Sequence, residues 1–252
     1  MRFDSKKVLI TGASRGIGRA AAIAFAGSGA IVGINYLSDD KNAMETLSRL
    51  QGEGHKLFKE DISTAEGAER LIENFLREYG SIDILINNAG IVQKHEIDKT
   101  DFEDWQKSWN SIINTNLISV ANLCYFAVRH MIRNGGGRIV NVSSRGAFRG
   151  EPDMPAYGAS KAALNSLSQS LAKKLAKYKI YVSVVAPGFV ETDMGINNIS
   201  EAEKTALMNE NPFQRMATAK EVAHSILFLA SEGSEYNTGA ILDINGASYL
   251  RS

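Results

Sequence analysis

A tyrosine and a lysine four residues apart, Tyr157 and Lys161, could together carry out proton transfer. On a helix, side chains with this spacing lie on one face, one turn apart. A free phenol has a pKa of about 10 and exchanges protons poorly near neutrality, but a nearby ammonium group favours the phenolate and lowers that pKa. Ser144, thirteen residues upstream, could hold a substrate oxygen. The three side chains together predict chemistry that interconverts an alcohol and a carbonyl compound.

The Tyr-x-x-x-Lys pattern is short, and helices that carry a tyrosine and a solvated lysine are common. Of the eight tyrosines in the chain, only Tyr157 has a lysine four residues on. This observation removes competing candidates but does not establish a site. The interpretation therefore depends on the elements that would position these residues.

Apolar, strand-like runs alternate with helical patterns along the chain. Strands are predicted over residues 7–11, 31–36, 55–60, 82–86, 138–142, 180–185 and 240–244, and helices over 17–28, 42–51, 65–79, 101–133, 156–178 and 219–229. Such alternation across short connections indicates a parallel sheet with helices on both faces. We therefore predict an α/β protein with a Rossmann-type, doubly wound parallel sheet.

No repeat, low-complexity tract or linker divides the chain, so a single domain is predicted over residues 1–252. Residues 188–218 are the exception to the alternation, because they contain no strand pattern and only a short helical pattern over 201–208. Long segments of this kind often close over sites. We predict that 188–218 form a substrate lid.

The segment TGASRGIG joins the first predicted strand to the first predicted helix and contains Gly12, Gly16 and Gly18. Glycines allow a ligand to approach the backbone, and the helix N-terminus offers free N–H groups and the positive end of its dipole to a pyrophosphate. Because the cluster lies between a strand and a helix, it predicts a dinucleotide site rather than an ordinary tight turn.

The end of the second predicted strand bears on the choice of cofactor. An acidic residue there would bond the adenosine ribose 2′-hydroxyl and repel a 2′-phosphate, but Asn35 and Tyr36 occupy this end and Arg15 stands in the glycine turn. We therefore expect NADP(H). NAD(H) remains an alternative because Asp39 and Asp40 follow, although a role as helix caps explains both.

Composition and charge exclude several classes of protein. Lys plus Arg equals Asp plus Glu at 28 each, so no bulk charge attracts nucleic acid or an anionic membrane. The single cysteine, Cys124, excludes an internal disulfide and is typical of a reducing compartment. The four histidines lack metal-ligand spacing, and the N-terminus resembles neither a signal peptide nor a membrane span. We expect a cytoplasmic protein without a metal, nucleic-acid or membrane partner.

The glycine turn and the pattern of Ser144, Tyr157 and Lys161 are both typical of one family. The chain resembles the short-chain dehydrogenase/reductase family over essentially its whole length. Asp61-Ile62, the NNAG segment 87–90 and the segment 187–194 also match, in the family's order. The resemblance implies that the catalytic residues are Asn116, Ser144, Tyr157 and Lys161. The predicted cofactor site comprises Gly12, Ser14, Arg15, Gly16, Ile17, Gly18, Asn35, Tyr36, Asp61, Ile62, Asn88, Ala89, Gly90, Tyr157, Lys161, Pro187, Gly188, Val190 and Thr192.

The resemblance also implies a mechanism. Ser144 would orient the substrate carbonyl and stabilise developing negative charge, and Tyr157 would give its proton to the oxygen as hydride arrives from the nicotinamide. Lys161 would lower the Tyr157 pKa and hold the nicotinamide ribose. Asn116 would anchor a water that links Lys161 to solvent.

Within the family, the length and the run PGFVETDM over 187–194 are similar to 3-oxoacyl-acyl-carrier-protein reductases. Arg129 and Lys173 fall about where those reductases present basic residues to the acidic carrier, although both could equally be solvated surface residues. The chain departs from those reductases at 91–94 and 151–155, which edge the substrate pocket. These departures leave the substrate open, so a sugar, a cyclic alcohol or a small ketone remains an alternative.

The resemblance further implies a homotetramer built on the long helices over 116–133 and 156–178. A dinucleotide sensor that had lost its chemistry is a second alternative. It is less favoured, because its mark would be a missing serine, tyrosine or lysine and all three are present. A nucleic-acid binder is set aside for lack of basic bias or an aromatic platform.

Overall fold

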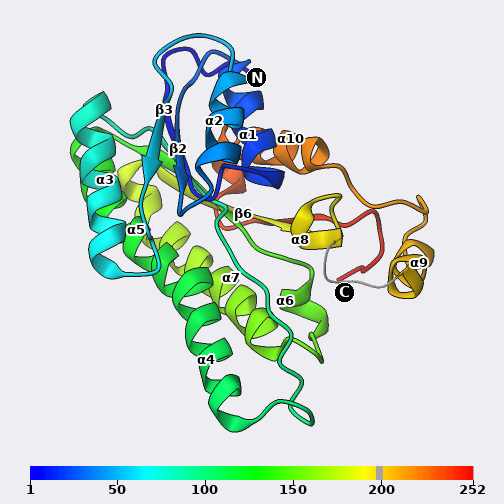
Figure 1. Ribbon diagram of the computed structural model, residues 1–252. Helices are drawn as coiled ribbons and strands as arrows, with labels where there is room; N and C mark the ends of the chain where they lie inside the picture. Colours follow the sequence, from blue (N-terminus) through cyan, green and yellow to red (C-terminus); the bar gives the residue numbers. More distant parts are fainter. Residues whose placement is uncertain (197–200, 252) are drawn as a thin grey trace.

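The computed structural model describes residues 1–196 and 201–251. Seven parallel strands form one sheet in the order β3-β2-β1-β4-β5-β6-β7. The strands are β1 (Lys7–Ile10), β2 (Ile31–Tyr36), β3 (Lys56–Lys59), β4 (Ile84–Asn87), β5 (Gly137–Val142), β6 (Ile180–Pro187) and β7 (Ile241–Ile244). The predicted Rossmann-type, doubly wound sheet is confirmed (Figure 1).

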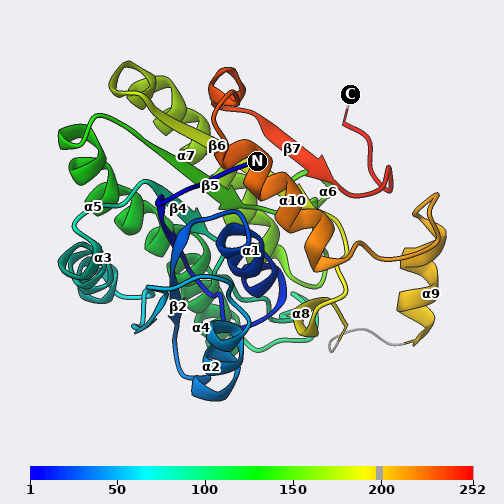
Figure 2. The same cartoon turned by 90° about the horizontal axis from the view of Figure 1, so that it is seen from above.

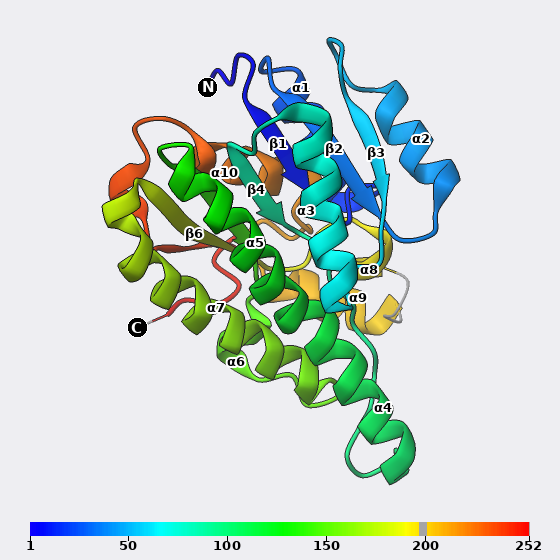
Figure 3. The same ribbon diagram turned by 90° about the vertical axis from the view of Figure 1, so that its left-hand side faces the viewer.

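Helices cover both faces of the sheet. They are α1 (Gly16–Ala26), α2 (Asp40–Ser48), α3 (Ala65–Tyr79), α4 (Phe102–Ile113), α5 (Ser119–Arg133), α6 (Gly146–Arg149), α7 (Pro155–Leu175), α8 (Asp193–Ile196), α9 (Glu201–Asn209) and α10 (Ala219–Ala230). Helices α1 and α10 lie side by side on one face (Figure 2). Helices α3, α5 and α7 cover the other face (Figure 3).

Strand β1 shows how the sequence produces these layers. Side chains alternate between the two faces of a strand, so Val8 and Ile10 pack into the apolar cluster beneath α1 and α10. Leu9 points the other way, into the cluster beneath α3, α5 and α7. All three side chains are fully buried, which explains why the run is continuously apolar rather than alternating.

The strand order determines at which end of the sheet a ligand crevice forms. The chain runs outward from β1 to β3, then crosses back to place β4 on the other side of β1. In such sheets, ligands bind in the crevice outside the carboxyl ends of the two strands at this switch point. The glycine turn follows β1 and the segment 88–90 follows β4, so the topology brings both to the same crevice.

The predicted helix over 101–133 contains a π-helical segment, η1 (Asn114–Ile118), between α4 and α5. The continuous helix Phe102–Arg133 is the one helix in the described part of the chain that is long and apolar enough to cross a membrane by length and composition alone. Its two halves pack on α7 and α3, as a helix of the fold does. Helix α4 projects beyond the sheet (Figure 3).

The predicted lid region contains two short helices, α8 and α9, of which only α9 was expected. Residues 197–200, which belong to this predicted lid, lie outside the described residues. Val190 forms a parallel bridge with Ala217, so the two ends of the segment meet. Helix α9 stands away from the sheet (Figures 1 and 2). A role as a lid stays a prediction.

Candidate active site

Helix α7 carries two of the four predicted catalytic residues. It begins at Pro155, whose fixed φ and missing N–H suit the first position of a helix. The Lys161 Nζ lies 5.8 Å from the centre of the Tyr157 ring. Lys161 is only 4% exposed, and its Nζ donates a hydrogen bond to the Val142 carbonyl oxygen at 2.9 Å. An ammonium group is therefore held inside the protein near the phenol ring.

Burial shifts the pKa of both groups. It lowers the pKa of Lys161 from 10.5 to about 8, because a charged group is poorly solvated in the interior. Burial raises the pKa of Tyr157; the nearby Ser144 hydroxyl opposes this shift, and the Glu151 carboxylate adds to it. The predicted lowering of the Tyr157 pKa is therefore wrong for this structure, because desolvation of the phenol dominates.

Ser144 lies just after β5, where the chain turns into the short helix α6. Its Oγ accepts the Gly146 N–H at 3.0 Å, and its hydroxyl lies near enough to the Tyr157 phenol to lower the pKa of that group. Helix α6 packs against the start of α7. This packing brings the two hydroxyl groups together in the folded chain.

Asn116 lies in η1 and is fully buried. Its Oδ1 accepts the Ile91 N–H at 2.8 Å, and its Nδ2 donates to the Ile91 carbonyl oxygen at 2.9 Å. The Nδ2 also lies 3.2 Å from Ser160 Oγ on α7. A Cβ at Gly90 would lie 3.2 Å from Asn116 Oδ1 and 3.4 Å from Lys161 Nζ. The segment after β4 thus meets both side chains, and the four predicted catalytic residues surround one location.

The glycine turn approaches this location from β1. Gly12 has a φ of +61°, and a Cβ there would lie 2.8 Å from Ala89 Cα. A Cβ at Gly18 would lie 2.5 Å from the Gly12 carbonyl oxygen. Side chains at either position would displace the backbone of the turn. Helix α1 begins without a side-chain cap, so its first N–H groups face the crevice without a side-chain partner, as a pyrophosphate site requires.

Hydrogen bonds join the turn to the end of β4. Thr11 Oγ1 accepts the N–H groups of Asn88 and Ala89, each at 3.0 Å. Asn88 Nδ2 donates to the carbonyl oxygens of Thr11 at 2.9 Å and Gly12 at 3.0 Å. The glycine turn and the segment after β4 are therefore joined by four hydrogen bonds. These residues fit a dinucleotide cofactor.

Comparison with known proteins identifies the family. A family model described as enoyl-(acyl carrier protein) reductase matches residues 12–247. The 3-oxoacyl-[acyl-carrier-protein] reductase FabG of Escherichia coli strain K12 is 37% identical over 251 residues, or 99% of this chain and 100% of that protein. The chain belongs to the short-chain dehydrogenase/reductase family. The predictions of the family and of an oxidoreductase are confirmed.

Other short-chain dehydrogenases/reductases are similar over comparable lengths. FabG of Chlamydia trachomatis is 36% identical over 244 residues, covering 96% of each chain. A dehydrogenase/reductase from Sinorhizobium meliloti superimposes with a TM-score of 0.90 at 30% identity, covering 99% of this chain and 97% of its own. A short-chain dehydrogenase from Burkholderia cenocepacia in complex with NADP has a TM-score of 0.87 at 30% identity, covering 98% of this chain and 99% of its own.

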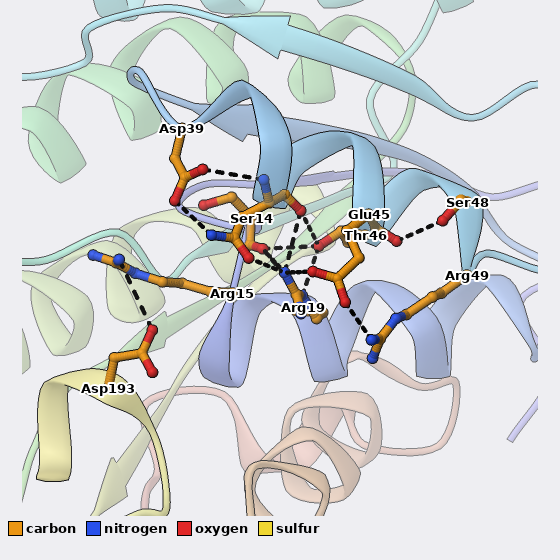
Figure 4. A network of polar contacts seen from close by, with 10 residues as sticks. Ser14, Arg15, Arg19, Asp39, Glu45, Thr46, Ser48, Arg49 and Asp193 are labelled. Atoms are coloured by element: carbon orange, nitrogen blue, oxygen red, sulfur yellow. Dashed lines mark hydrogen bonds and ion pairs between the residues drawn. The ribbon is translucent and has the colours of Figure 1, made fainter.

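Arg19, which the sequence analysis did not single out, locks the glycine turn of this short-chain dehydrogenase/reductase to α2 (Figure 4). Its guanidinium donates to the Ser14 carbonyl oxygen at 2.7 Å and to Thr46 Oγ1 at 2.9 Å. It also donates to Asn42 Oδ1 at 2.7 Å and pairs with Glu45 at 3.2 Å. The sequence signal that could have identified Arg19 is a basic residue in the first turn of the helix after the glycine turn.

Arg15 differs from Arg19, because its side chain is 61% exposed and its nearest ion-pair partner, Asp193 on α8, lies 3.9 Å away (Figure 4). Asp39 Oδ1 accepts the Asn42 N–H at 3.1 Å and so caps α2. The interpretation as a helix cap is confirmed for Asp39 and wrong for Asp40, which is the first residue of α2 and accepts from Tyr36 and Lys59 instead. The Arg15 guanidinium beside the glycine turn is therefore largely solvated, while the carboxylate of Asp39 has a structural partner.

Other predicted cofactor residues of this family member have protein partners for their side chains. Asn35 Nδ2 donates to the Phe58 carbonyl oxygen at 3.2 Å, and the Tyr36 hydroxyl donates to Asp40 at 2.8 Å. Asp61 accepts from the Ser63 backbone N–H at 2.9 Å and from its hydroxyl at 2.7 Å. Ile62 packs in the apolar core beneath α3. The first three side chains hold strands and turns together, and cofactor contacts from all four residues stay predictions.

The segment after β6 reaches the glycine turn from the far side. The Pro187 carbonyl oxygen accepts the Arg145 N–H at 2.8 Å, which ties the end of β6 to the residue after Ser144. Val190 is buried. A Cβ at Gly16 would lie 3.3 Å from the Thr192 methyl group. The base of the predicted lid therefore lies against the dinucleotide turn.

The loop between Ser144 and Tyr157 carries charged residues to which the sequence motifs gave no role. Arg145 is 3% exposed and donates to Glu210 at 3.0 Å and to Ser248 at 2.8 Å. Arg149 donates to the same carboxylate at 3.0 Å. Burial raises the pKa of Glu151, whose Oε1 would lie 2.4 Å from a Cβ at Gly146. This edge of the site is therefore strongly polar.

Proposed function

We propose that this protein is an NADPH-dependent oxidoreductase that reduces a carbonyl to a secondary alcohol, and that it is a 3-oxoacyl-acyl-carrier-protein reductase or a close relative. The observation that carries the proposal is the meeting of Ser144, Tyr157, Lys161 and Asn116 at the crevice that the glycine turn enters. The names of the similar FabG proteins support the substrate class.

Each side chain has a role that follows from its position. Ser144 donates a hydrogen bond to the substrate carbonyl and holds it beside Tyr157. Tyr157, whose phenol lies near the Ser144 hydroxyl, gives its proton to the carbonyl oxygen. Lys161 supplies positive charge behind the phenol, and Asn116 fixes the backbone of Ile91 against α7. When bound, the cofactor supplies the hydride.

We propose NADP(H) as the cofactor, on the basis of Arg15. A guanidinium binds phosphate oxygens strongly and in a directed way, and this one is largely exposed at the adenosine end. A structural neighbour at 30% identity was solved in complex with NADP. Tyr36 and Asn35 introduce no acidic group at the end of β2 that would repel a 2′-phosphate.

Initial rates with NADPH and NADH test this function, using an acetoacetyl thioester and a panel of unrelated ketones. We expect the thioester with NADPH to be turned over well above every panel ketone. A preference for a panel ketone would overturn the substrate class and keep the chemistry. Tight cofactor binding without turnover of any substrate would favour a dinucleotide sensor.

Replacing Arg15 with alanine is expected to lower the ratio of kcat/KM with NADPH to that with NADH about tenfold to a hundredfold. The physical reason is the loss of one charge-assisted hydrogen bond to phosphate, which contributes about 1.5–3 kcal/mol. Asp193→Ala is the matched control, because it removes the partner carboxylate and leaves the guanidinium. An unchanged ratio in Arg15→Ala would exclude this residue from cofactor selection.

A second candidate function is the reduction of a small, polar ketone. The observation that favours it is the Glu151 carboxylate near Tyr157, on the loop that also carries Arg145 and Arg149. Charged side chains suit a substrate with hydroxyl or other polar groups better than an apolar acyl chain. Faster turnover of hydroxylated ketones than of the thioester would select this candidate.

Binding to acyl carrier protein and assembly into a homotetramer also stay proposals. Lys173 is exposed on α7, whereas Arg129 on α5 donates to the Tyr125 hydroxyl at 2.9 Å and is partly engaged. Ile118, Tyr125 and Ile132 are exposed at seven-residue intervals along η1 and α5. This apolar stripe is suited to helix packing between subunits. A cytoplasmic location stays a prediction.

A further inference from the structure

His95 is a fully buried polar residue outside the proposed catalytic group. Its Nε2 lies 3.1 Å from the Ala156 backbone nitrogen, and its Nδ1 lies 2.9 Å from the Gln93 carbonyl oxygen. A backbone N–H can only donate, so Nε2 is the acceptor and Nδ1 carries the proton. The backbone N–H of His95 in turn donates to the Asp153 carbonyl oxygen at 2.8 Å. His95 and the segment 153–156 therefore donate hydrogen bonds to each other.

This contact is made at the start of the helix that carries Tyr157. The first N–H groups of a helix have no partner within it and are satisfied by a cap. In α7 the preceding residue, Met154, provides no side-chain cap, and Pro155 has no N–H. Ala156 therefore offers the first N–H of the helix, and the imidazole of His95 accepts it from 61 residues away in the chain. Tyr157 is the next residue.

The imidazole is itself held by the projecting helix α4. Its ring contacts the Trp105 ring edge-on, at 5.3 Å between centres, and Trp109 packs behind Trp105 at 5.9 Å. Helix α4 also packs directly on α7. The His95 ring is therefore fixed from one side while it holds the start of α7 from the other.

We propose that His95 is a positioning residue for the reaction, which caps α7 from the segment after β4 and so fixes the Tyr157 hydroxyl relative to Ser144. This inference rests on the proposed carbonyl reduction. Small displacements of a reacting group lower rates steeply. The same segment carries Gly90 and Ile91, which contact Lys161 and Asn116. His95 therefore couples the position of the proton donor to that of its supporting residues.

Two polar substitutions that differ only in reach test the proposal. A glutamine at position 95 places its amide oxygen near the position of Nε2, whereas an asparagine reaches only as far as Nδ1. We expect kcat to fall about tenfold in His95→Asn and to stay within about threefold of wild type in His95→Gln. The KM for NADPH is expected to stay within about twofold in both, because neither change touches the glycine turn.

A second measurement does not depend on turnover. Hydrogen exchange of the backbone N–H groups over 156–158 is expected to quicken in His95→Asn and to stay near wild type in His95→Gln. The two tryptophans of the chain, Trp105 and Trp109, both lie beside this site. Equal tryptophan emission in the two variants therefore shows that they share the packing of α4, because both lose the imidazole contact with Trp105.

Equal losses of kcat in the two variants, or unchanged exchange over 156–158 in His95→Asn, would overturn the proposal. Exchange that behaves as expected in a protein without turnover of any carbonyl would leave the cap in place and refute the proposed function instead. The two failures are thus distinguishable.

Discussion

Replacing Tyr157 with phenylalanine is expected to lower kcat about a thousandfold while the affinity for NADPH stays unchanged. General acid catalysis by a positioned side chain contributes about 10²–10⁴-fold, and the phenol hydroxyl is the group that lies near Ser144. The ring remains, so packing at the start of α7 and the ring's contact with Lys161 are kept. Single-turnover rates and NADPH fluorescence titration measure the two quantities separately.

Tyr178→Phe is the matched control, because Tyr178 is the partly exposed tyrosine of the short turn after α7. It is expected to leave both quantities near wild type. Turnover of Tyr157→Phe within about tenfold of wild type would refute the role of Tyr157 as proton donor. A parallel loss of NADPH affinity would instead indicate that the substitution disturbed the whole crevice.

Replacing Lys161 with methionine is expected to abolish most turnover and, at the same time, to stabilise the protein at pH 7. Burial lowers the pKa of Lys161 from 10.5 to about 8. The fold therefore disfavours the ammonium by about 3 kcal/mol. Methionine removes this cost but leaves the Val142 carbonyl oxygen without its donor. A net gain of about 1–2 kcal/mol in the free energy of unfolding remains.

The lowered pKa of Lys161 determines how the free energy of unfolding changes with pH. Between pH 8 and 10.5, the unfolded chain keeps a proton on Lys161 that the folded chain has released. The free energy of unfolding therefore rises with pH across this window, and the cost of burial is fully present below it. Lys161→Met removes this rise. Urea denaturation without cofactor at pH 7 and pH 10 measures the difference.

Lys174→Met on the exposed face of the same helix is the control, since it changes neither a buried charge nor the site. It is expected to leave the pH dependence as in wild type. If Lys161→Met showed the wild-type rise between pH 8 and 10.5, the buried ammonium would not be its source. If it kept wild-type kcat, the proposed electrostatic role would fail.

Local patterns in the sequence were sufficient for the fold and for much of the proposed site. Continuous apolar runs such as β4, and glycines between β1 and α1, are dictated by burial on both faces and by close backbone approach. Both are properties of neighbouring residues. The Tyr157 and Lys161 pair is likewise local, because the period of one helix brings the two side chains together. Its proximity to Ser144 was implied by the family resemblance and needed the packing of α6 on α7.

Tertiary structure alone decided the environment of these groups. The direction of the Tyr157 pKa depends on desolvation by the surrounding fold, which spacing along a helix does not report. Asn35 was expected at the cofactor, but its side chain joins β2 to β3, because the register of the two strands places the Phe58 carbonyl oxygen within reach. His95 has no spacing signal, since the path of the loop after β4 brings it to Ala156. Contacts between distant segments depend on where the whole chain runs, and this is the information that the order of residues along one element does not contain.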